Sequence, residues 1–104
     1  MERVAFTMQL KAGFVDEYRR RHAEIWPELR ALLQKAGISD YSIFLDPNSL
    51  KLFAVQKIED GESPFVLADQ PIMGRWWDYM ADIMEVNSDN SPVCTTLIEV
   101  FHLD

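Results

Sequence analysis

The chain has 104 residues, of which 48% are hydrophobic and 26% charged, and this size and composition predict one globular domain spanning residues 1–104. The net charge of −7 argues against nucleic acid and against heavily phosphorylated substrates, because both require clustered lysines and arginines. The single cysteine excludes an internal disulfide, and no apolar run reaches membrane-spanning length, so we expect a cytoplasmic protein that binds no membrane.

The first half of the chain predicts a strand followed by an interrupted helix. Hydrophobic and polar residues alternate over about residues 3–10, which indicates a strand. Apolar residues then recur at helical spacing over about residues 14–36. Pro27 lies inside this helix, lacks an N–H group and clashes with the preceding turn, so we expect a kink or break around residues 23–27.

Three consecutive arginines at 19–21 are the nearest approach to a basic patch. Asp16, Glu17 and Glu24 flank them on the same predicted helix. We interpret the run as a solvated helix face, because neighbouring opposite charges at this spacing pair on a helix surface.

A hairpin is predicted next, with strands over about residues 40–45 and 51–58 joined by a turn at 46–49. Both of its faces carry apolar residues, as Phe44 beside Ile43 illustrates. A sheet of this kind needs cover on both sides. We expect the helices to cover one side and a partner subunit to cover the other.

The second half predicts a helix and a final strand. We expect a loop over residues 60–64 and a short helical segment over 65–68, followed by a break at Pro71. A helix should then span about 72–85, a polar loop 87–92 and a final strand 94–102. The complete β-α-β-β-α-β order predicts an α+β protein of the ferredoxin-like class.

His22 is the first candidate for chemistry, because its side chain can give and take a proton near neutral pH. Tyr18 lies one helical turn earlier on the same face. The alternative is a structural histidine in the core, on the same stripe as Leu29, and its position alone favours that alternative.

The adjacent pair Trp76 and Trp77 is the second candidate feature, since flat aromatic rings suit the apolar faces of a sugar. Neighbours on a helix point about 100° apart. Trp77 aligns with Met80 and Met84 and is therefore as well explained by the core as by binding. For Trp76 a binding or interface role is favoured. Neither a metal-binding Cys/His motif nor a glycine-rich phosphate loop is present in the sequence.

Four segments of the chain resemble those of the L-rhamnose mutarotases, in the same order and at the same spacing. They are YRRRHAEIWPEL (18–29), YSIFLD (41–46), RWWDYMADIM (75–84) and DNSPV (89–93). The resemblance covers nearly the whole chain. It implies a homodimeric α/β barrel of the cytoplasm that uses no cofactor and acts on a small neutral sugar, L-rhamnose.

The resemblance also implies roles for individual residues. His22 matches the catalytic histidine, described as a proton donor, while Tyr18, Tyr41, Trp76 and Trp77 match residues that contact the sugar. Mutarotation opens the pyranose ring to the aldehyde and closes it on the other face, so it needs an acid and a base. We assign His22 as the acid towards the ring oxygen and leave Tyr18, a carboxylate or a water as candidates for the base.

Two other functions fit the same features. A haem-degrading or small-aromatic monooxygenase uses a similar dimeric barrel, and His22 would then be an iron ligand or a proton relay. A non-catalytic sugar-binding module would instead hold His22 in its core. The first would bind haemin, and the second would bind sugar without speeding anomer exchange.

Overall fold

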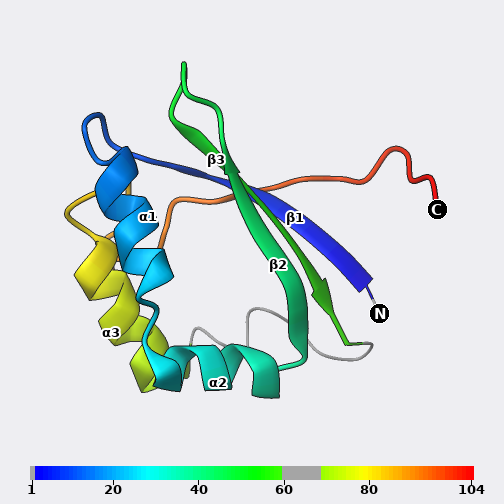
Figure 1. Cartoon of the computed structure of the whole chain (residues 1–104), viewed down its shortest axis with the longest axis horizontal. Coiled ribbons are helices and arrows are strands. Elements are labelled where there is room, and N and C mark those ends of the chain that lie inside the picture. Colours follow the sequence, from blue (N-terminus) through cyan, green and yellow to red (C-terminus); the bar gives the residue numbers. More distant parts are fainter. Residues whose placement is uncertain (1, 60–68) are drawn as a thin grey trace.

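A computed structural model of the protein describes residues 2–59 and 69–104. Its elements follow the order β1, α1, α2, β2, β3, α3, β4 (Figure 1). Their bounds are Glu2–Gln9, Val15–Ala23, Pro27–Lys35, Ile38–Leu45, Lys51–Ile58, Pro71–Met80 and Thr95–Thr96. The predicted loop at 60–64 and the helical segment at 65–68 lie outside the described residues.

The strands form one sheet in the order β2-β3-β1-β4, with antiparallel neighbours throughout. The helices lie together on one side of this sheet (Figure 1). The predicted ferredoxin-like arrangement is therefore confirmed, with its first helix in two pieces. The predicted hairpin is also confirmed, and Asp46 closes its turn by accepting hydrogen bonds from the Asn48 N–H and the Ser49 hydroxyl.

The predicted interruption around residues 23–27 is present between α1 and α2. Trp26 has extended backbone angles, φ −60° and ψ 130°, as expected of a residue before proline. Pro27 is the first residue of α2, where its missing N–H costs nothing. The chain thus changes direction directly after His22 and Ala23, and Trp26 is placed at the junction.

Two predicted elements are shorter than expected. The helix predicted over 72–85 ends at Met80, because the following residues pair with the end of β1 instead. The Lys11 N–H donates to the Ile83 carbonyl at 3.0 Å, and the Glu85 N–H donates to the Gln9 carbonyl at 2.9 Å. Backbone groups satisfied in this way cannot also continue a helix.

The strand predicted over 94–102 is reduced to β4, Thr95–Thr96. The Leu97 N–H still donates to the Ala5 carbonyl at 2.9 Å, and strand pairing ends beyond it. The far end of the chain still contacts β1, because the Arg3 guanidinium donates to His102 Nδ1 at 2.7 Å. We call residues 97–104 the C-terminal arm. Its apolar side chains beyond Leu97 are between 77% and 94% exposed: Ile98, Val100, Phe101 and Leu103.

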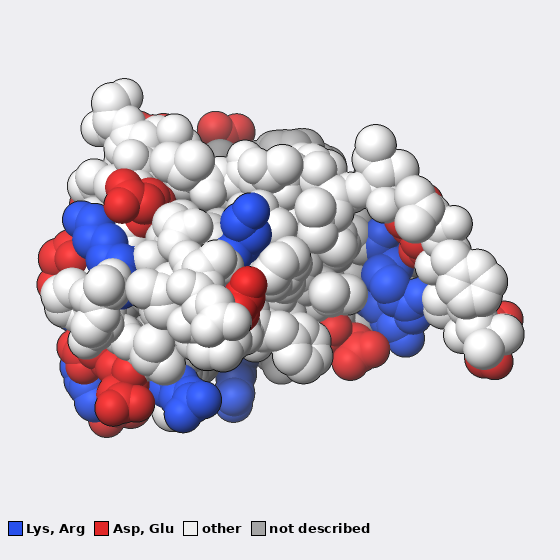
Figure 2. Space-filling view, turned by 90° about the horizontal axis from the view of Figure 1, so that it is seen from above, with Lys and Arg blue, Asp and Glu red and all other residues white. Residues whose placement is uncertain are grey.

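The sheet face opposite the helices is uncovered in the single chain. Phe44 on β2 pairs with Phe53 on β3, and the Phe44 side chain is 63% exposed. In Figure 2 the C-terminal arm protrudes from the body, and most of the surface seen from above is uncharged. No helix among the described residues is long and apolar enough to cross a bilayer.

An irregularity in β2 positions Tyr41. The register with β3 shifts by one residue between Ser39 and Ser42, and Asp40 has a left-handed φ of 48°. The extra residue lets Ile38 and Ile43 both pack on the helix side although they are five positions apart. Alternation back from Ile43 places Tyr41 on that side as well.

The main core lies between the sheet and the helices. Leu29, Leu52, Met80 and Ile83 are fully buried there, and Leu29 of α2 is 1% exposed. Tyr18 and Trp76 belong to the same buried cluster. These two candidate site residues are therefore held by the core rather than by loops.

We expect Leu29→Ala to lower the free energy of unfolding by about 2–5 kcal/mol, because it removes a fully buried side chain and leaves a cavity. Gln34→Ala on the exposed face of the same helix should stay within about 0.5 kcal/mol of the parent. Chemical denaturation of both variants measures the difference. Equal stabilities would show that α2 does not anchor this core.

Candidate active site

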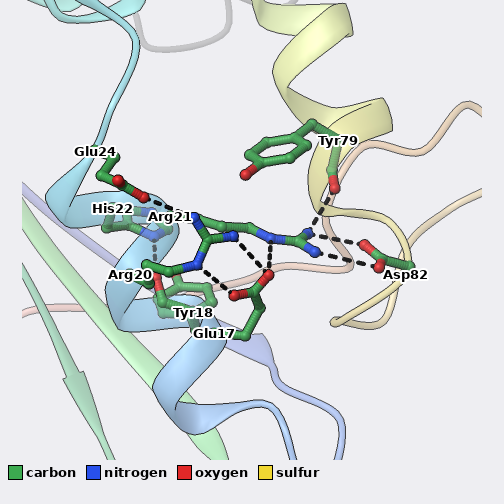
Figure 3. Close-up of polar contacts among 8 residues, drawn as sticks. All are labelled: Glu17, Tyr18, Arg20, Arg21, His22, Glu24, Tyr79 and Asp82. Atoms are coloured by element: carbon green, nitrogen blue, oxygen red, sulfur yellow. Dashed lines mark hydrogen bonds and ion pairs between the residues drawn. The ribbon is translucent and has the colours of Figure 1, made fainter.

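His22 and Tyr18 lie one turn apart on α1, and their rings stack with centroids 4.2 Å apart. The spacing of four residues brings the two side chains onto one face, as the sequence predicted. His22 Nδ1 lies 3.1 Å from the backbone carbonyl oxygen of Tyr18 (Figure 3). The imidazole is partly exposed, so a ligand can approach it.

This contact decides which nitrogen of His22 carries the proton. A carbonyl oxygen only accepts hydrogen bonds, so Nδ1 must be the donor. Burial lowers the pKa of His22, and the hydrogen bond to Tyr18 opposes that shift more weakly. The resting side chain is therefore a neutral imidazole at neutral pH, with the unprotonated Nε2 as a base.

Aromatic rings from α1, α3 and the junction before α2 surround the histidine. The Trp76 ring meets His22 edge-on at 5.5 Å and meets Trp26 edge-on at 5.1 Å. Tyr79 packs against both tryptophans, at 5.4 Å from Trp26 and 5.6 Å from Trp76. We call Tyr18, His22, Trp26, Trp76 and Tyr79 the aromatic cluster.

The two adjacent tryptophans are buried in the reverse of the predicted order. Trp76 is 6% exposed and belongs to the core, whereas Trp77 is only partly buried against it. The prediction extended α3 to residue 85 and used Met84 to define its buried face. Because α3 ends at Met80, the buried face contains Trp76 and Met80 instead, four residues apart.

Tyr41 approaches the site from the sheet. Burial raises the pKa of Tyr18, and the nearby Tyr41 contributes to the same shift. Burial raises the pKa of Tyr41 to about 12. Tyr41 as a residue is 38% exposed, so a ligand can reach it. Both phenols stay protonated at neutral pH and can donate or accept hydrogen bonds.

The arginine run is not a purely solvated face, which corrects the prediction made for residues 19–21. Arg21 is only 8% exposed, and its guanidinium binds the Asp82 carboxylate beyond the end of α3 (Figure 3). Arg20 fits the prediction, because it is exposed and pairs with Glu17 and Glu24. Spacing on one helix could not reveal a partner 61 residues away.

The assembled site thus contains a neutral acid–base group, two neutral hydroxyls and an aromatic wall. His22 contacts both Tyr18 and Trp76, Tyr41 is near enough to Tyr18 to affect its pKa, and Trp77 makes none of the ring contacts described for the cluster. Trp26 and Tyr79 were missed as members. The only signal for Trp26 was its place before Pro27, and Tyr79 shares a predicted helix face with Trp76. No group of acidic, histidine or cysteine side chains that could hold a metal occurs in the described ranges.

Comparison with known proteins identifies close relatives. The family model described as L-rhamnose mutarotase matches residues 3–103. The chain is 58% identical over 104 residues to the L-rhamnose mutarotase of Bacteroides thetaiotaomicron, with both chains covered completely. It is 56% identical over 102 residues to that of Flavobacterium johnsoniae, covering 98% of this chain and 95% of the relative.

A solved structure agrees with these relatives. The crystal structure of an L-rhamnose mutarotase from Formosa agariphila matches all of this chain and all of its own, with a TM-score of 0.93 and 48% sequence identity. The two folds therefore agree along the whole chain, including the helices that carry the aromatic cluster.

We expect nitrogen-15 NMR of the wild type to show His22 as the Nδ1–H tautomer at neutral pH, with a pKa below the ordinary 6.5. The chain has two histidines, so a His22→Phe variant assigns the signals by loss. A pH titration of the ring nitrogens makes the measurement. An Nε2–H tautomer would contradict the assignment of Nε2 as the base.

Proposed function

The chain belongs to the L-rhamnose mutarotase family, and we propose that it interconverts the anomers of L-rhamnose at the aromatic cluster around His22. The protein is an isomerase acting on a carbohydrate, as its relatives are. The monooxygenase alternative is not favoured by these comparisons. Residues 1–104 act in this proposal as one mutarotase domain.

The hydrogen bond from His22 Nδ1 to the Tyr18 carbonyl is the observation that carries the mechanism. It leaves Nε2 free to accept the proton of the anomeric hydroxyl. As that O–H bond breaks, its electrons form the aldehyde C=O, and the bond between the anomeric carbon and the ring oxygen breaks. The ring oxygen receives the electron pair and takes the proton from the imidazolium.

His22 therefore acts as the acid towards the ring oxygen, having first been the base towards the anomeric hydroxyl. Both oxygens are bonded to the same carbon, so one nitrogen can serve them in turn. Rotation of the aldehyde followed by the reverse steps forms the other anomer. The raised pKa of Tyr18 argues against that phenol as the base and supports it as a hydrogen-bonding partner of a sugar hydroxyl.

The remaining residues bind and orient the sugar in this proposal. Trp77, which is only partly buried, offers flat apolar surface to the C–H faces of the ring, and the buried Trp76 forms the back of that wall beside His22. Tyr41 supplies a polar contact at the edge of the sugar. Both phenols are neutral, so they suit a substrate that carries no charge. The carried-over roles of these residues thus agree with their chemistry.

We expect His22→Phe to slow anomer exchange of L-rhamnose by roughly 10²–10⁴-fold while leaving the fold and sugar binding intact. Saturation-transfer NMR at equilibrium measures the exchange, and a sugar titration followed by tryptophan fluorescence measures binding. His102→Phe makes the same change at the exposed second histidine and should leave the rate unchanged.

Two outcomes of that comparison would contradict the proposal. Exchange in His22→Phe near the wild-type rate would move the acid–base role elsewhere. If the wild type binds the sugar but exchanges its anomers no faster than buffer does, a binding module is favoured.

The exchange rate of the active wild type should fall as the pH drops through the lowered pKa of His22, below 6.5, because protonation removes the base.

The proposal includes a homodimer in the cytoplasm. The uncovered Phe44 and Phe53 on the sheet, together with the apolar C-terminal arm, support a second copy as the cover, because a monomer rarely exposes a large apolar surface. The single free thiol, Cys94, is exposed, which suits a reducing compartment.

We expect the wild type to elute with twice the 12.1 kDa mass of the chain in light-scattering chromatography. Phe44→Asp should weaken association by roughly 30-fold or more, because it places a charge at an interface core. Gln34→Asp adds the same charge to the exposed face of α2 and serves as the matched control. A wild-type monomer, or a Phe44→Asp dimer as tight as the control, would contradict this interface.

A further inference from the structure

Among the residues that the structure describes, Arg21 is the only charged one that is buried, at 8% exposed, and it directly precedes His22 on α1. Its guanidinium forms hydrogen bonds with groups of three other residues (Figure 3). The contacts are Nη1 to the Tyr79 carbonyl at 2.7 Å, Nη1 and Nη2 to the Asp82 carboxylate at 2.9 and 3.3 Å, and Nε to Glu17 at 3.0 Å.

One of these contacts completes the end of α3. The last carbonyls of a helix lack partners within the helix and favour a nearby cation. The last turn of α3 contains no basic residue of its own. Arg21 supplies both the hydrogen bond and the positive charge from α1, which ties the two helices together at this point.

The same guanidinium also positions an aromatic ring. Its central carbon lies 4.5 Å from the centroid of the Tyr79 ring, a cation–π contact. Tyr79 packs in turn against Trp26 and Trp76, and Trp76 meets His22 edge-on. The arginine thus contacts the cluster directly through Tyr79.

We propose that Arg21 is a positioning residue for the reaction: it fixes the end of α3, and with it Trp76, against the His22 imidazole on α1. This inference rests on the proposed function, since it concerns the same imidazole. Arg21 does not touch the sugar. It acts by holding the wall and the acid–base group at one separation, and small displacements of such groups cost much of the rate.

A lysine could not replace this arginine. The fork of the guanidinium reaches the Tyr79 carbonyl and both Asp82 carboxylate oxygens while its central carbon lies over the Tyr79 ring. An ammonium group is a point charge that cannot make this set of contacts together. Arg21→Lys therefore keeps the charge and removes the geometry.

We expect Arg21→Lys to lower the maximal exchange rate by about 10- to 100-fold, with half-saturation by L-rhamnose changed by about twofold or less. Exchange NMR over a range of sugar concentrations separates the two quantities. The ring nitrogen signals of His22 should shift in this variant. Circular dichroism fixes a temperature at which each protein is folded.

Arg20→Lys is the matched control, because Arg20 is the neighbouring arginine, binds the same Glu17 and lies at the surface. It should retain the wild-type rate and the wild-type His22 signals. Asp82→Asn tests the same contact from the other side, because it removes the carboxylate charge and keeps nearly the same side-chain size. It should lower the maximal rate in the same direction as Arg21→Lys.

The proposal is overturned if folded Arg21→Lys and Asp82→Asn keep the maximal rate of Arg20→Lys. A lower unfolding midpoint with an unchanged rate and unchanged His22 signals would likewise leave Arg21 with a purely structural role. If Arg21→Lys does not fold, Asp82→Asn alone decides. A failure of the proposed function is distinct, because exchange with the wild type would then be no faster than in buffer.

Discussion

Pro27 determines where the site forms, because α1 cannot continue through it. In one unbroken helix, Trp26 would lie one turn above His22 along the same cylinder. The break instead leaves Trp26 extended at the start of α2, where its ring packs on Trp76 and Tyr79 of α3. The interruption thus lets two helices share one aromatic cluster, with His22 at the partly exposed end of α1.

The element order could be predicted because each periodicity depends on adjacent residues. Alternation indicated the strands, helical spacing indicated the helices, and Pro27 marked the break. The ends of α3 and β4 could not be predicted in this way. Residues after Met80 bond to the end of β1, and strand pairing ends after Leu97, so distant backbone groups decide both boundaries. The extra residue of β2 that brings Tyr41 to the helix side also depends on pairing with β3.

The same distinction applies to the site. Tyr18 and His22 are one turn apart on one helix, so their contact follows from spacing. The burial of Trp76 depends on where α3 ends, and the burial of Arg21 depends on Asp82 and Tyr79, which lie about sixty residues away in the chain. Flanking acids made the arginine run resemble an ordinary surface, and this interpretation holds for Arg20 and is wrong for Arg21.

Two acidic side chains, Glu17 and Asp82, are paired with arginines of α1, and the pKa of His22 is set mainly by its burial. A carboxylate beside an imidazole would raise the pKa of that histidine and convert it to the cation. Here Arg20 and Arg21 bind Glu17 and hold its pKa at about 2, and Arg21 also binds Asp82 and lowers the pKa of that carboxyl. Two features shift the pKa of His22: burial lowers it, and the hydrogen bond to the Tyr18 carbonyl raises it. Burial has the larger effect. Burial, rather than a neighbouring charge, therefore keeps His22 neutral at neutral pH.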